Sequence, residues 1–442
     1  MTPVGLFLLS IAAIFLIGAV GEVMFQRTSI PDVIWLILAG ILLGPVGDVV
    51  TREQLGVIAP YFAALTLVVV LFDGGCKLHV DELLRSARRS SLLAVLSFVL
   101  AVAAVAPVTM FAATIGVLPE QWTWAHGIMA GCILGGSSSI IIMPAMAQAK
   151  VEPQVASLVS IESALTDALC VVGTAALIDV ILSGKSGAAG PVSSLLTSFS
   201  LGVGIAFVAG VVWTLFLRFL NSSEHSYPVT LAALLVLYVV IDRAGGSAAL
   251  GILTFAIVLG NADLLSRRIG LIHHVQLDVS VRGFHKQMTF MVKSFFFVFI
   301  GAMLGPPWLL VLAGVVLGGV LFVARIPAVI VGTFGSLLSS DQKRLVTVSM
   351  PRGMAAGVLA TLPLSAGVPG TGPLPVLVFA CVFTTILVFA VGFPLMRAQR
   401  PTPEADATAT APAAPDPWPS ELVAPAAQDP TPSPPPPDRT SG

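Results

Sequence analysis

The sequence predicts an all-α polytopic membrane protein with about thirteen transmembrane helices. Of its 442 residues, 56% are hydrophobic and only 10% are charged, whereas charged residues make up about 25% of ordinary soluble domains. The mean hydropathy is +0.97. Apolar runs of the length that crosses a bilayer, which is ~20 residues at 1.5 Å rise, recur along the chain. These observations exclude an ordinary soluble protein.

Apolar runs and the polar, Gly or Pro breaks between them define the candidate spans. The spans begin near residues 4, 31, 57, 91, 124, 155, 193, 227, 247, 285, 306, 344 and 372. Several are short or interrupted by Gly and Pro, as is typical of transporters, in which unwound backbone lines a cavity. The first run, Val4 to Phe25, lacks a basic region before it and is longer than a signal-peptide core, so we expect it to stay as a helix.

Lys and Arg are distributed unevenly over the predicted loops. With the N-terminus outside, sixteen of the 22 basic residues fall on the inside, and only Arg52, Lys185 and Arg243 fall on the outside. Lys293, Arg325 and Arg352 lie within spans. Under the positive-inside rule, this bias predicts an outside N-terminus, a cytoplasmic C-terminus and an odd number of spans.

The last segment of the chain differs in composition. Residues 398–442 are rich in Pro, Ala, Thr and Asp and have almost no large apolar side chains. Such a segment cannot offset the entropy of ordering, so we expect a disordered cytoplasmic tail after a transmembrane domain of residues 1–397.

Two carboxylates interrupt the apolar span from Val155 to Leu182. Glu162 and Asp167 fall near mid-membrane, where an ionised side chain costs at least ~2.5 to 3.5 kcal/mol and usually faces a partner or a water-filled path. On a helix, Ser163 and Asp167 share a face, and Glu162 lies about 140° from Asp167. The span therefore offers two separate acidic sites.

Two further spans contain residues that disfavour a continuous helix. The run GGSSSIIIMP (Gly135 to Pro144) and the run SMPRGMAAGVLATLP (Ser349 to Pro363, with Arg352) combine Gly, Pro and polar residues. Freed carbonyls at a mid-membrane break can bind a cation, although the first run could also be a packing seam of small residues. Their positions, seven spans apart, predict corresponding elements of two inverted repeats.

Two other polar features, Lys293 and Asp73, have two interpretations each. Lys293 needs a partner, for which Glu162 and Asp167 are the candidates, in either a structural salt bridge or a transport role. Asp73, near the inner end of the third span, is either solvated or part of a site. The four cysteines (Cys76, Cys132, Cys170 and Cys381) show no disulfide or metal-binding spacing and are interpreted as small apolar fillers.

These motifs together resemble the monovalent cation:proton antiporter superfamily over residues 4–396. The most specific is ESALTDA (Glu162 to Ala168), which is similar to the E-S-x-x-N-D signature of that superfamily. IPDVIWLILAGILLGP (Ile30 to Pro45), FDGG (Phe72 to Gly75), the Ser-rich break, the K-S-F-F-F setting of Lys293 and PRG (Pro351 to Gly353) support it.

The resemblance implies thirteen helices, a dimerisation subdomain and a mobile core subdomain with two crossing broken helices. It also implies that Asp167 carries the ion or proton, that Glu162 is a structural acid with Lys293 as its partner, and that Arg352 belongs to the second broken helix. Two departures concern ion coordination: Thr166 replaces the Asn or Asp before the key Asp, and the Ser-rich break lacks the Asp of the usual Thr-Asp-Pro.

The function expected from this reasoning is exchange of Na⁺, or of K⁺ or Li⁺, for H⁺ by alternating access. Burial and a nearby cation shift a carboxylate pKa in opposite directions, so Asp167 can bind a cation or a proton in competition. Ser163, Thr166, Asp73 and Ser138 are the further candidate cation ligands.

A cation channel and a cation-coupled organic-anion symporter remain alternatives. No protease-type motif supports an enzyme, and no cofactor or nucleic-acid partner is expected. We expect electroneutral exchange, because Thr166 cannot titrate. We also expect the protein to serve pH homeostasis as a homodimer in the inner membrane.

Overall fold

The computed structural model describes residues 3–28, 30–50, 52–76, 78, 80–183, 189–220, 226–262, 279–336 and 338–398. Within these ranges the chain is helical and contains no strand. The helices are α1 (Pro3–Thr28), α2 (Asp32–Ile41) with the π-helical turn η1 (Leu42–Val46), α3 (Arg52–Cys76), α4 (Val80–Thr114), α5 (Trp124–Ile133), α6 (Ser139–Gln148), α7 (Pro153–Ser183), α8 (Ala189–Leu220), α9 (Ser226–Arg243), α10 (Ala248–Gly260), α12 (Val279–Met303), α13 (Trp308–Gly332), α14 (Ser340–Val348), α15 (Met354–Leu359), α16 (Leu362–Ser365) and α17 (Leu374–Ala398).

The helix starts agree with the predicted span starts in most of the chain. Helices α5, α7, α9 and α10 begin within two residues of the predicted positions 124, 155, 227 and 247. The largest difference is at α4, which begins at Val80 and not near residue 91. There the charged segment before the apolar run continues the same helix, and hydropathy alone does not detect such an extension. The number of spans and the tail predicted for 398–442 are not settled by this agreement, since residues 399–442 lie outside the described part.

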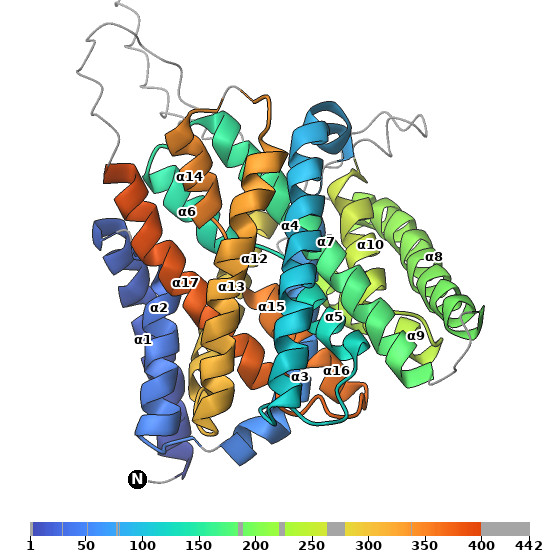
Figure 1. The fold of residues 1–442 in the computed structure, drawn as a ribbon. Coiled ribbons are helices and arrows are strands. Elements are labelled where there is room, and N and C mark those ends of the chain that lie inside the picture. The colour runs from blue at the N-terminus through green and yellow to red at the C-terminus, as the bar shows by residue number, and fades with distance from the viewer. Residues whose placement is uncertain are drawn as a thin grey trace, which may run out of the picture. The chain divides into compact units, whose positions relative to one another are not determined.

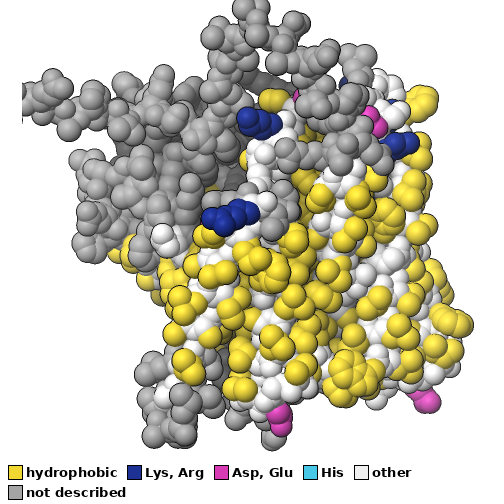
Figure 2. Space-filling view, turned by 90° about the vertical axis from the view of Figure 1, so that its left-hand side faces the viewer, with side chains coloured by type: hydrophobic (Ala, Val, Ile, Leu, Met, Phe, Trp, Pro, Cys, Tyr) yellow, Lys and Arg dark blue, Asp and Glu magenta, His cyan; other side chains and the backbone are white. Residues whose placement is uncertain are grey.

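Five helices of the described part are long and apolar enough to cross a membrane: Arg89–Thr114, Pro153–Ser183, Leu196–Leu217, Trp308–Gly332 and Leu374–Met396. Large apolar side chains such as Val208 and Val323 are exposed on these helices. In Figure 2, the described part of the face is covered mostly by apolar side chains. A soluble protein rarely exposes so large an apolar surface, so this face contacts lipid.

Within residues 3–398, long helices run roughly alongside one another, and the start of α1 and the end of α17 lie on opposite sides (Figure 1). Helix α13 packs against both α4 and α17, and α7 packs against α4 and α5. Helix α3 packs against α10, and α2 packs against α12. The short helices α5, α6, α14 and α15 lie among these long ones, so the irregular backbone between them is enclosed by protein.

Small residues allow very close contact between α2 and α12. A Cβ atom added to Gly40 would lie 2.1 Å from the Val298 carbonyl oxygen, and one added to Gly301 would lie 2.1 Å from the Ile37 carbonyl oxygen. Real Cβ atoms do not approach backbone this closely, so both positions require glycine. This is the small-residue packing by which membrane helices gain van der Waals contact.

Candidate functional site

The first of the two predicted breaks lies between α5 and α6. Helix α5 ends at Ile133 and α6 begins at Ser139, which leaves segment 134–138 outside both helices. Helix α7 holds this segment by its main chain, because Ser163 Oγ donates to the Ser137 carbonyl at 2.7 Å and the Ser137 N–H donates to Thr166 Oγ1 at 3.3 Å. The prediction of a broken helix here is confirmed.

The second predicted break separates α14 from α15, and it crosses the first. Residues 349–353 lie between Val348, where α14 ends, and Met354, where α15 begins. The Ser138 N–H donates to the Pro351 carbonyl at 2.8 Å. A Cβ atom on Gly353 would lie 2.2 Å from Ser138 Oγ. The two unwound segments are thus in direct main-chain contact, and only glycine fits at position 353.

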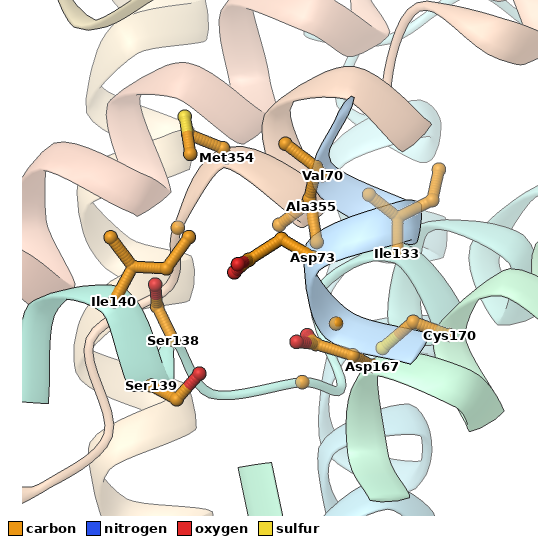
Figure 3. A pocket seen from close by; sticks show the side chains of 14 residues that line it. Val70, Asp73, Ile133, Ser138, Ser139, Ile140, Asp167, Cys170, Met354 and Ala355 are labelled. Carbon is orange, nitrogen blue, oxygen red and sulfur yellow. The ribbon is translucent and has the colours of Figure 1, made fainter. Parts of the chain in front are cut away.

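A small cavity lies beside this crossing. Asp73 from α3, Ser138 from the first break and Asp167 from α7 line it, together with Gly353 and Cys170. Figure 3 shows both carboxylates and the Ser138 hydroxyl turned toward the same space. The space open to the centres of water-sized spheres is about 20 Å³, and ~10–15 Å³ holds one water molecule. The cavity therefore has room for one cation with few of its own waters.

The structure brings three of the predicted cation ligands, Asp73, Ser138 and Asp167, to this one cavity. Ser138 is 7% exposed, and within the described part its hydroxyl has no hydrogen-bond partner. An oxygen in this condition is available to a ligand in the cavity. That these three residues bind a cation remains a prediction, which the geometry supports.

The other two predicted ligands, Ser163 and Thr166, serve the main chain in this structure. Both are fully buried, and neither is among the residues that line the cavity. Thr166 Oγ1 donates to the Ser163 carbonyl at 3.0 Å and accepts from the Ser137 N–H. Their hydroxyls therefore support the shape of the break.

The two acids of α7 lie in separate environments, as the helix geometry predicted. Asp167 faces the cavity, whereas Glu162 forms a bidentate ion pair with Arg325 of α13. Arg325 Nη2 donates to Glu162 Oε2 at 2.7 Å, and Arg325 Nη1 donates to Ser97 Oγ of α4 at 2.7 Å. The side chains of Glu162 and Arg325 are 1% and 3% exposed. This buried pair connects α7, α13 and α4.

The predicted pairing of Lys293 with Glu162 or Asp167 is wrong. Lys293 Nζ lies 2.5 Å from Asp32 Oδ2 of α2, and each side chain is 16% exposed. The ammonium also lies 5.7 Å from the ring centre of Phe290. Because α12 packs against α2 and carries Lys293 there, Lys293 is not among the residues that line the cavity. The partner that Glu162 requires is Arg325, whose position within an apolar span was the signal available in the sequence.

Arg352 lies in the second break, as predicted, and is 3% exposed. Its main-chain N–H donates to Thr385 Oγ1 of α17 at 3.0 Å. Its side chain is not among the residues that line the cavity, and its Nε atom has no hydrogen-bond partner in the described part. Arg352 thus contributes positive charge close to the crossing and does not contact a bound cation here.

Comparison with known proteins agrees with this architecture. The family model for the transmembrane part of sodium/hydrogen exchangers matches residues 11–397. The chain is 23% identical over 379 residues to the K(+)/H(+) antiporter NhaP of Alkalimonas amylolytica, which covers 84% of this chain and 62% of that protein. It is 28% identical over 400 residues to the K(+)/H(+) antiporter NhaP2 of Shewanella oneidensis, covering 86% and 65%. The chain therefore spans less than two thirds of the length of these two relatives.

Two solved structures share the fold, and one sequence relative comes from the same organism. The Na(+)/H(+) antiporter 1 of Methanocaldococcus jannaschii is 23% identical over 354 residues, covering 78% of this chain and 80% of that protein. The structure of the sodium proton antiporter MjNhaP1 of that organism at pH 8 superposes with a TM-score of 0.67 at 19% identity, over 89% of this chain and 99% of that one. Its electron-microscopy structure gives a TM-score of 0.69 at 18% identity, over 90% and 98%.

Proposed function

This chain belongs to the sodium/hydrogen exchanger family, and from this premise we propose that it exchanges a monovalent cation for H⁺ across the cell membrane by alternating access. Na⁺ is the first candidate, with K⁺ and Li⁺ beside it, because the relatives include antiporters named for Na⁺ and for K⁺. A cation channel and an organic-anion symporter find no support among these relatives.

The observation that carries the proposal is the meeting of Asp167 and Asp73 at one cavity beside the crossing of two broken helices. Asp167 binds the cation or a proton in competition, with Asp73 and Ser138 as further oxygen ligands. A carboxylate that accepts one or the other couples the two fluxes without further machinery. Broken helices supply the rest of the site, since their ends and free carbonyls stabilise ions at mid-membrane.

Glu162 and Asp32 are excluded as carriers by their surroundings. Glu162 is fully buried against Arg325, and Asp32 contacts Lys293. The carboxylate oxygens of Glu162 and Asp32 already contact a guanidinium and an ammonium group, so they are poorly placed to bind a transported cation. We assign both pairs a structural role.

The proposed exchange is electroneutral, with one cation moved per proton. Thr166 cannot titrate, and the contact of Lys293 with Asp32 places the ammonium away from the cavity. Lys293 is therefore not a second proton carrier in this scheme. Asp73 must then keep one protonation state through the cycle, which the measurement of stoichiometry tests.

The proposed orientation places the C-terminal end of α17 in the cytoplasm of a cell with this protein in its inner membrane. Exposed basic residues of the described part, such as Arg27, Arg89 and Arg344, belong to the predicted inner side. Of the exposed basic residues in the described part, Arg243 belongs to the predicted outer side. The larger number of basic residues on the predicted inner side supports an inside-positive orientation. We expect a homodimer, as the family resemblance implies.

The variant Asp167→Asn tests the proposal, because it removes the titratable group and preserves the shape of the side chain. In proteoliposomes with a pH-sensitive dye, we expect it to abolish H⁺ movement on addition of Na⁺, K⁺ or Li⁺ while size-exclusion chromatography shows a folded protein. The matched control is Asp242→Asn, an exposed residue at the end of α9 that should keep full activity. Wild-type exchange in Asp167→Asn would refute Asp167 as the carrier.

Clamping the membrane potential tests the stoichiometry. With a gradient of the permeant anion thiocyanate setting the potential and Na⁺ as the only alkali cation, we expect the rate and end point of exchange to be independent of voltage. A voltage-dependent end point would mean that more than one proton moves per cation, and Asp73 would then be the second carrier to examine.

A further inference from the structure

The wall of the cavity next to Asp167 is formed by a sulfur atom. Cys170 follows Asp167 by three residues on α7, so the two share a helix face, and both line the cavity. Figure 3 shows the Cys170 side chain beside that of Asp167. Cys170 is 2% exposed, so the cavity is the space that it borders.

Gly136 of the first break lies next to both the Cys170 sulfur and the Asp167 carboxylate. A Cβ atom on Gly136 would lie 3.0 Å from Cys170 Sγ and 3.1 Å from Asp167 Oδ1. The two atoms therefore border the same small volume, which the missing side chain of Gly136 leaves open. The Gly136 main chain also lies within hydrogen-bonding reach of the Cys170 side chain.

The chemistry of this wall differs from that of the opposite side of the cavity. Asp73 and Ser138 present oxygen atoms to the cavity, and hard cations take oxygen ligands. Sulfur is a soft and weak acceptor, so Cys170 supplies no effective ligand for an alkali cation at its own position beside Asp167. The loss is larger for a small ion, because the attraction to each oxygen increases as the contact distance shortens. Li⁺ and Na⁺ thus lose more binding energy than K⁺ when sulfur takes the place of an oxygen ligand at Cys170.

We propose that Cys170 is a specificity-determining residue of the transport site, which reduces the preference for small cations and lets the site accept K⁺ beside Na⁺. This inference rests on the proposed function. The sequence alone indicated only a small apolar side chain at Cys170.

Cys170→Ser tests the inference, since it places an oxygen where the sulfur lies. We expect the ratio of apparent affinities for Na⁺ over K⁺ to rise roughly three- to tenfold, the range of one added contact to an ion. Cys170→Ala, which removes the sulfur without adding an oxygen, should leave the ratio within about twofold. Cys381→Ser is the matched control, because Cys381 is buried on α17 and does not line the cavity. An unchanged ratio in an active Cys170→Ser protein would overturn the inference.

A second measurement on the wild-type protein is independent of how the variants fold. A small thiol reagent, followed by mass spectrometry of the cysteine peptides, reports labelling of each thiol. We expect saturating K⁺ or Na⁺, compared with choline at equal ionic strength, to slow labelling of Cys170 but not of Cys76, which is partly exposed and does not line the cavity. Equal labelling of Cys170 with and without the cation would contradict its place at the ion.

These outcomes separate the two proposals. Absence of cation-dependent H⁺ exchange in the wild type refutes the proposed function. Normal exchange with an unchanged selectivity in Cys170→Ser refutes only the role of Cys170.

Discussion

Removal of the Arg325 side chain should be among the most damaging single changes in the membrane helices. Arg325→Gln leaves the Glu162 carboxylate, 1% exposed, without the guanidinium that it contacts through both oxygens. Breaking a buried pair by deleting one partner costs about 3–5 kcal/mol. With an unfolding entropy of roughly 2.1 cal/mol/K per residue over ~390 residues, this lowers the melting temperature by on the order of 5 °C.

A double-mutant cycle in detergent measures the coupling. Glu162→Gln alone should cost a similar amount, because it leaves the guanidinium unpaired, whereas Glu162→Gln combined with Arg325→Gln removes both charges and should cost much less than the sum of the two single losses. Glu162→Gln with Lys293→Gln serves as the control, and its two effects should add, since Lys293 contacts Asp32. Additive losses in the Glu162 and Arg325 cycle would refute the reasoning, and coupling to Lys293 would restore the pairing expected from the sequence.

Three further outcomes follow from the packing around the site. Gly40→Ala should lower thermal stability by more than ~1–3 kcal/mol, because its Cβ atom would lie 2.1 Å from a carbonyl oxygen of α12, while Gly319→Ala, with nothing within 4 Å, should be neutral in the same melting assay. Gly353→Ala should abolish exchange, and Ser138→Gly should partly restore folding in that background, as judged by size-exclusion chromatography; failure of Ser138→Gly to help would show that the clash lies elsewhere. Asp73→Asn should raise the KM for the cation roughly tenfold with H⁺ coupling retained, and an unchanged KM would exclude Asp73 as a ligand.

Local chemistry made the broken helices predictable. Gly, Pro and hydroxyl residues are concentrated in the runs Gly135 to Pro144 and Ser349 to Pro363, where together they disfavour a regular helix, and both breaks are present in the structure. Pro144 itself lies within α6, so proline alone does not mark the break. The angular separation of Glu162 and Asp167 was equally predictable, because residues five apart on one helix must face different sides. These inferences depend on a single segment each.

The ion pairs were not predictable in this way, because they depend on which helices are neighbours. Lys293 required a partner, and the sequence offered several acids; only the packing of α12 on α2 selects Asp32. Arg325 was equally visible as an intramembrane charge, yet its reach to Glu162 follows from the arrangement of α13 beside α4 and α7. For Thr166, the residue type indicated a possible cation ligand, but its hydroxyl accepts a hydrogen bond from the Ser137 N–H of the break.

The hydrogen bond from the Ser138 N–H to the Pro351 carbonyl links the two crossing segments through atoms that every residue but proline possesses at position 138. Because the bond joins main-chain atoms, a change of the Ser138 or Pro351 side chain does not remove it, unless proline replaces Ser138. The bond also joins the two segments directly, so any displacement of one segment that preserves this bond must carry the bonded part of the other segment with it.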